Sequence, residues 1–102
     1  MANVKVTIEV ECYAGDEIYI CGNIPQLGSW DCKKALPMKK ENGRYSITKM
    51  LPQGQVVEFK FLKKQDWAFV EKGMYGEELV NHILFVSKGM ETQHYGVDKF
   101  GE

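Results

Sequence analysis

Several features that mark other classes of protein are missing from this 102-residue sequence. No apolar run approaches the roughly 20 residues that a membrane-spanning helix needs, which argues against an integral membrane protein. Thirteen basic residues stand against fourteen acidic ones, so the sequence lacks the overall basic charge expected of a nucleic-acid binder. The first residues contain no basic segment followed by an apolar one, so we expect no signal peptide and a cytoplasmic location.

The three cysteines, Cys12, Cys21 and Cys32, match no metal-binding pattern. Their odd number prevents complete pairing within one chain, and their spacing lacks the close cysteine pairs of zinc sites. Neither His82 nor His94 belongs to a His-x-x-x-His arrangement, so we expect no metal and no other cofactor. We interpret the cysteines as small buried side chains in a reducing cytosol; the alternative is one disulfide and a spare thiol in an oxidising setting.

Catalytic motifs are also missing. Glycoside hydrolysis needs two carboxyl groups facing each other across a cleft, roughly 5 to 10 Å apart. Glu77 and Glu78 are adjacent, so on a strand they would point to opposite faces. The sequence contains no glycine-rich phosphate loop, nucleophile elbow or His-Glu motif. We therefore expect no catalytic residues in this chain.

What the sequence does contain is a series of short segments in which apolar and polar residues alternate, with turn signals about every ten residues. This alternation predicts strands, edge strands and extended segments. They cover residues 4–12, 18–21, 35–38, 44–50, 57–62, 67–70, 82–86 and 93–100. Turns are predicted at Ala14-Gly15-Asp16, Asn42-Gly43 and Pro52-Gln53-Gly54, with a long loop over 22–31. A short helix over 77–84 is an alternative to the strand that begins at His82.

About seven to eight short strands without a long helical pattern predict an all-β, antiparallel β-sandwich. Because 102 residues are too few for two stable cores, we expect a single domain over residues 1–102. Its core would span about residues 4–88, with a C-terminal extension over 89–102.

Aromatic residues make up 12% of the chain, and some lie where a core would not need them. Trp30 lies in the 22–31 loop, where a simpler interpretation is a lid on the core. Alternation places Lys60 on the opposite strand face from Phe59 and Phe61, so its stem leaves the core while those rings enter it.

Three blocks of sequence together resemble the family 20 carbohydrate-binding modules, the starch-binding domains. They are Ile18-Tyr19-Ile20-Cys21-Gly22-Asn23-Ile24-Pro25-Gln26-Leu27-Gly28-Ser29-Trp30-Asp31, then Leu51-Pro52-Gln53-Gly54 running into Glu58-Phe59-Lys60-Phe61-Leu62-Lys63-Lys64, then Asn81-His82. The resemblance spans most of residues 4–86. It implies an immunoglobulin-like β-sandwich, in agreement with the strand pattern. It also implies noncatalytic binding of α-1,4-glucan, as starch, glycogen, maltooligosaccharides or cyclodextrin.

The resemblance implies a first glucan site in which Trp30 stacks on a glucose ring. Lys60 matches a lysine that bonds to sugar hydroxyls, and Asn81 matches an asparagine that does so from the other side. The family's second tryptophan, which lies a few residues before that asparagine and precedes an acidic residue, has no direct match. We expect Trp67 to be the second stacking platform, with Tyr75 as its competitor.

A second glucan site is implied less directly, since Tyr19 matches a family aromatic and Tyr45 lies near another. Aromatic planes suit the apolar C–H face of glucose, while polar side chains serve its hydroxyl rim. Two tryptophans at an angle, both exposed beside Lys60, suit a curved α-1,4-glucan better than a flat cellulose ribbon. We expect weak binding, with Kd on the order of 10 µM to 1 mM per site.

The expected partners are an α-glucan and a covalently linked catalytic domain, such as a carbohydrate-active or phosphodiesterase enzyme. The main alternative is a protein-interaction β-sandwich whose exposed aromatics anchor a protein partner. Single-stranded nucleic acid is less favoured, because Lys60, Lys63 and Lys64 near Trp67 are typical of a solvated strand end.

Overall fold

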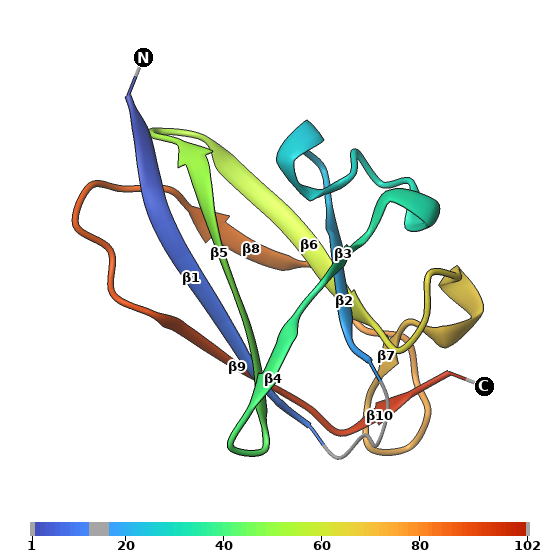
Figure 1. Ribbon diagram of the computed structural model, residues 1–102. Helices are drawn as coiled ribbons and strands as arrows, with labels where there is room; N and C mark the ends of the chain where they lie inside the picture. The colour runs from blue at the N-terminus through green and yellow to red at the C-terminus, as the bar shows by residue number, and fades with distance from the viewer. Residues whose placement is uncertain (1, 13–16, 102) are drawn as a thin grey trace.

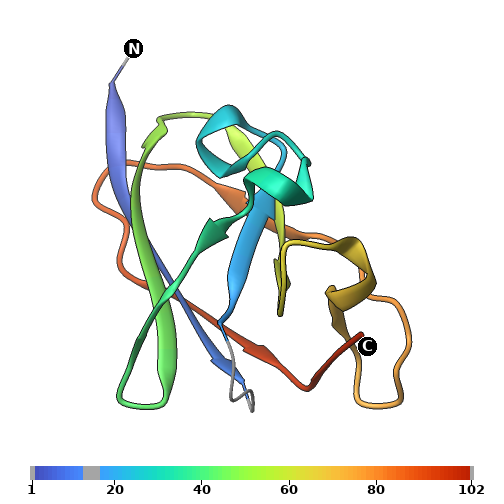
Figure 2. The same ribbon diagram turned by 45° about the vertical axis from the view of Figure 1, so that its right-hand side comes forward.

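The computed structural model describes residues 2–12 and 17–101, which fold into a β-sandwich (Figures 1 and 2). One four-stranded sheet has the order β4-β5-β1-β9 and the other the order β3-β2-β6-β8, with a two-stranded sheet β10-β7 beside them. The strands are β1 (Asn3–Cys12), β2 (Tyr19–Gly22), β3 (Leu36–Pro37), β4 (Lys39–Glu41), β5 (Arg44–Pro52), β6 (Val56–Leu62), β7 (Glu71–Lys72), β8 (His82–Phe85), β9 (Gln93–Val97) and β10 (Lys99–Phe100).

Three short 3₁₀ helices complete the described structure: η1 (Pro25–Leu27), η2 (Cys32–Lys34) and η3 (Trp67–Phe69). Within residues 2–12 and 17–101, no helix has the length and apolar character needed to cross a lipid bilayer. The all-β architecture predicted from alternation is confirmed.

The core lies between the inner faces of the two four-stranded sheets, where the alternating apolar residues of each strand meet. β1 buries Val6, Ile8 and Val10, while β6 buries Phe59 and Phe61. The polar residues between them point outward, as the period-two pattern predicted. Alternation therefore determines which face of each sheet remains free for a binding site.

Two predicted local features are confirmed. The Asn42-Gly43 pair joins β4 to β5, and both residues have positive φ angles, +52° and +79°, which suit a tight two-residue hairpin turn. Residues 82–85 form strand β8 and not part of a helix. The turn predicted at Ala14-Gly15-Asp16 lies outside the described residues.

One prediction is wrong, and another holds with one exception. The segment predicted as extended at 67–70 contains η3, because the Asp66 side chain accepts a hydrogen bond from Ala68 N at 2.9 Å and bends the chain. The antiparallel sandwich is confirmed with one exception: β9 pairs in parallel with β1. Residues 86–92 carry the chain from β8 across to the other sheet (Figure 1), and a crossover of this kind allows parallel pairing.

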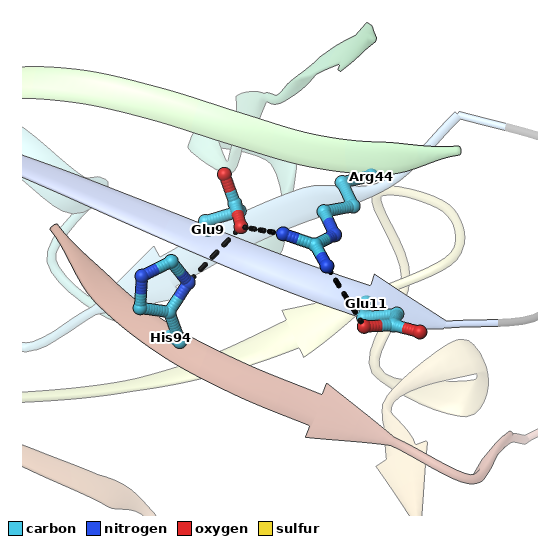
Figure 3. A network of polar contacts seen from close by, with 4 residues as sticks. All are labelled: Glu9, Glu11, Arg44 and His94. Carbon is cyan, nitrogen blue, oxygen red and sulfur yellow. Dashed lines mark hydrogen bonds and ion pairs between the residues drawn. The ribbon is translucent and has the colours of Figure 1, made fainter. Parts of the chain in front are cut away.

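A network of charged side chains covers part of the outer face of the β4-β5-β1-β9 sheet (Figure 3). Arg44 Nη1 lies 3.1 Å from Glu9 Oε1, and His94 Nδ1 lies 3.0 Å from the same oxygen. Arg44 Nη2 reaches Glu11 Oε2 at 3.8 Å. The network joins β1, β5 and β9, and each exposed pair adds little to stability.

Candidate functional site

The loop between β2 and β3 holds Trp30 in an unusual backbone conformation. Gly28, Ser29 and Trp30 all have positive φ angles, +89°, +49° and +61°. This region is unfavourable for a bulky side chain. Hydrogen bonds from Trp30 N to Gly22 O (2.8 Å) and from Ser29 N to Ile24 O (3.0 Å) hold the turn in place. The loop thus fixes the direction in which the indole leaves the backbone.

Trp30 and Trp67 form a tilted aromatic pair on the outer side of the β3-β2-β6-β8 sheet. Their ring centroids are 6.0 Å apart and their planes meet at 48°. Trp67 is 36% exposed, whereas Trp30 is half-buried against a small apolar cluster of Cys21, Ala35 and Leu62. The angled arrangement agrees with the prediction, but Trp30 is less exposed than expected because this cluster supports its ring.

The two loops that carry the tryptophans are fastened to each other. Gln65 Nε2 donates to the carbonyl oxygens of Lys33 (3.2 Å) and Ala35 (3.0 Å). Each tryptophan also has an aspartate beside it that caps a 3₁₀ helix: Asp31 accepts from Lys33 N and Asp66 from Ala68 N. Sequence reasoning missed Gln65, because nothing in its local pattern reveals a partner about 30 residues away.

Lys60 and Asn81 lie on the same outer face. Lys60 points away from the buried Phe59 and Phe61, as predicted, and its Nζ donates to Leu79 O at 2.7 Å. An ammonium group has three donors, so two are left for other acceptors. Asn81 Nδ2 donates to Glu58 Oε1 at 3.3 Å, and its amide oxygen can still accept a hydrogen bond. The face therefore offers both hydrogen-bond donors and acceptors beside the tryptophan pair.

A buried glutamate–histidine contact lies beneath this surface. Glu71, with 1% of its surface exposed, bonds to His82 Nε2 through both carboxylate oxygens, at 2.9 and 3.0 Å. The His82 ring packs against Phe59 and Tyr95, with centroid distances of 5.4 and 4.8 Å. The pair ties β7, which follows the Trp67 loop, to the start of β8 next to Asn81. Sequence reasoning did not find it, because the residues lie eleven positions apart.

The remaining predicted site residues lie in different places. Tyr75 is 88% exposed in the loop before β8, and the ring that meets Trp30 is that of Trp67. Tyr19 is half-buried, and the hydrogen bond that its hydroxyl donates to Glu17 raises the pKa of Tyr19.

The assignment of Tyr45 to a second surface site is wrong. Only 1% of its surface is exposed, because Tyr45 occupies an inward position of β5 and its side chain packs in the core between the two sheets. No cluster of His, Cys, Asp and Glu suited to a metal ion occurs among residues 2–12 and 17–101.

Comparison with known proteins identifies the family. The family model described as "Starch binding domain" matches residues 2–93. An amylopullulanase from Thermoanaerobacter thermohydrosulfuricus is 36% identical over 93 residues, covering 87% of this chain and 6% of the amylopullulanase.

Solved structures share the fold. A glucoamylase from Hypocrea jecorina superposes with a TM-score of 0.80 at 21% identity, over 97% of this chain and 18% of the glucoamylase. The family 20 carbohydrate-binding module of a maltotetraose-forming amylase from Pseudomonas saccharophila gives a TM-score of 0.64 at 24% identity, over 90% and 99% of the two chains.

The chain therefore belongs to the starch-binding domain family, a class of noncatalytic carbohydrate-binding modules. It spans about a tenth or less of the length of the curated relatives that it matches. The alternative of a protein-interaction β-sandwich is not favoured by these matches.

Proposed function

We propose that the tilted pair of Trp30 and Trp67, with Lys60 and Asn81 beside it, is the α-1,4-glucan site of this chain. The observation that carries the proposal is the 48° angle between two indole rings whose centroids lie 6.0 Å apart. Two planes at this angle can contact successive glucose units of a curving chain. A flat polysaccharide ribbon cannot lie on both.

The polar groups supply orientation and not much net affinity. Each hydrogen bond to a sugar hydroxyl replaces one to water, so the net gain per bond is small. A nearly neutral protein and an uncharged ligand also give no electrostatic attraction. We expect Kd on the order of 10 µM to 1 mM for one site, with little dependence on salt.

The cellular setting is part of the same proposal. The three cysteines are free, which supports a reducing, cytoplasmic location. Starch or glycogen would then be the natural polysaccharide. The module would hold this polysaccharide near a catalytic domain in the same polypeptide. The binding module would then form only a small part of a longer enzyme.

Titration with maltoheptaose or β-cyclodextrin, followed by tryptophan fluorescence and calorimetry, tests the site. Trp30→Ala should weaken binding about tenfold or more, which corresponds to about 1.4 kcal/mol. Trp67→Ala should act in the same direction, whereas Tyr75→Ala should leave Kd unchanged. Met50→Ala, an exposed apolar position on the other sheet, is the matched control.

If a folded Trp30→Ala protein binds maltoheptaose with an unchanged Kd, the tryptophan pair is not the glucan site and the proposal is wrong. Far-ultraviolet circular dichroism of each variant separates loss of binding from loss of fold.

A further inference from the structure

A strip of exposed apolar side chains lies on the two neighbouring strands β6 and β8. Val56, Ile83 and Phe85 are 53%, 66% and 59% exposed. The strands are antiparallel, and Val56 pairs directly with Phe85 while Ile83 pairs with Glu58. These three side chains therefore form one contiguous outer strip, in which an aromatic ring lies beside two branched aliphatic groups.

The strip continues the surface that carries the candidate site. Val56, Glu58 and Lys60 are alternate residues of β6, so they share its outer face. Glu58 accepts the hydrogen bond from Asn81, and Asn81 precedes Ile83 by two residues. Lys60 lies four positions along the strand from Val56, a distance of about 13 Å. The outer face thus passes from the tryptophan pair, through Lys60 and Asn81, to an apolar end.

The polar residues along this path are already held in place. Asn23 Oδ1 accepts from Glu58 N at 3.0 Å, and Asn23 N donates to Glu58 O at 2.9 Å. These bonds fix the Asn23 amide beside the sheet, between Lys60 and the strip. Alternating polar and apolar surface of this kind matches the hydroxyl rim and C–H faces of a sugar chain.

We propose that Val56, Ile83 and Phe85 form an outer subsite for α-glucan chains longer than the tryptophan pair can cover. The Phe85 ring and its aliphatic neighbours contact the apolar face of a glucose unit beyond the one at Lys60 and Asn81. This inference rests on the proposed function, since the chain must first be held at Trp30 and Trp67.

The size of the strip favours a sugar chain over a protein. Stable protein interfaces bury about 800 Å² on each partner and use about 20–30 residues a side. Three apolar side chains fall far short of that, but a single aromatic ring is enough to cover one pyranose face. A partner protein or a second copy of this chain would need additional apolar surface around the strip, where Glu58 and Asn23 lie instead.

Comparing a short and a long ligand tests the outer subsite. Kd for maltotriose and for maltoheptaose is measured by calorimetry on the unaltered chain, Phe85→Ala, Ile83→Thr and the control Met50→Ala. Loss of the Phe85 ring should weaken maltoheptaose binding about three- to tenfold and leave maltotriose binding unchanged. Ile83→Thr keeps a β-branched side chain in the strand and should give a smaller loss of the same kind.

The possible outcomes are separable. If the unaltered chain binds maltoheptaose and the Phe85→Ala protein has the same Kd for both ligands as the unaltered chain, the outer subsite is wrong and the proposed function stands. If the unaltered chain binds neither ligand, the proposed function fails and takes the subsite with it. A concentration-dependent dimer in analytical ultracentrifugation that Phe85→Ala abolishes, with ligand-length dependence intact, would assign the strip to self-association and overturn the subsite.

Discussion

Glu71 is an acidic side chain that the fold encloses almost completely, and His82 is its side-chain partner at both oxygens. A buried polar group is tolerated when hydrogen bonds within the protein replace those that it has lost to water. Phe61 N also approaches Glu71 Oε1, at 3.4 Å. The hydrogen bonding of this buried group therefore depends on His82 and on the backbone of β6.

His82→Ala should lower the free energy of unfolding by about 1–3 kcal/mol, because it removes the side-chain hydrogen-bond partner of the buried Glu71 carboxyl group. Urea denaturation at neutral pH measures this change. His94→Ala is the matched control, since that histidine pairs with Glu9 at the exposed surface, and its loss should cost less than about 1 kcal/mol. Similar losses in the two variants would contradict the role given to the buried pair.

At the scale of elements, the loop that carries Trp30 depends on a glycine for two reasons. Gly28 has a φ angle of +89°, and the Cβ of any other residue there would lie 2.8 Å from the Lys34 carbonyl oxygen. Backbone atoms cannot move aside as a flexible side chain can. The turn that directs Trp30 is thus coupled to the end of η2.

Gly28→Ala should destabilise the protein and also weaken glucan binding, because the turn must shift and carry the indole with it. Gly43→Ala is a close control: Gly43 also has a positive φ, +79°, but no atom lies within 4 Å of the added Cβ. Gly43→Ala should cost about 1–2 kcal/mol through backbone strain alone, with Kd unchanged. Chemical denaturation and maltoheptaose titration of both variants check these expectations, and equal effects on Kd would refute the coupling.

The elements that sequence predicted well are those in which burial alternates with period two. The strand β1 was predicted from Val6, Ile8 and Val10, because every second side chain of a strand on a sheet surface is buried. The same rule could have placed Tyr45 inside, since it alternates with the exposed Arg44 on β5. We instead assigned Tyr45 to a surface site because it lies near an aromatic position of the family.

Features that depend on caps, or on contacts between distant segments, were not predictable from alternation. Asp66 forms a local cap that overrides the extended pattern of 67–70, and alternation carries no information on such a cap. The Glu71–His82 pair and the bridge made by Gln65 need the folded chain before their partners meet. The parallel pairing of β9 with β1 depends on where residues 86–92 cross, which local sequence does not encode.

At the scale of the whole molecule, burial of thiols makes stability sensitive to alkaline pH. Burial raises the pKa of Cys21 to about 11, and the nearby Cys32 and Asp31 act in the same direction. Burial also raises the pKa of Cys12 to about 11, against the lowering effect of Lys40. In the unfolded chain these thiols ionise near pH 9.

This difference makes the stabilising contribution of both thiols complete below about pH 9 and lost as the pH rises through about 11. The melting temperature should therefore fall across that range. Cys21→Ala, which has no thiol to ionise at this position, should show a shallower fall when melting curves are recorded at each pH. An identical fall in both proteins would show that the Cys21 thiol is not responsible.

The charged network of Glu9, Arg44 and His94 lies on the sheet whose outer face is opposite to the tryptophan pair. A molecule bound to a starch granule through the tryptophan pair would expose this charged outer face to the solvent. Molecules bound side by side on one granule would then present these ionic groups to bulk solvent.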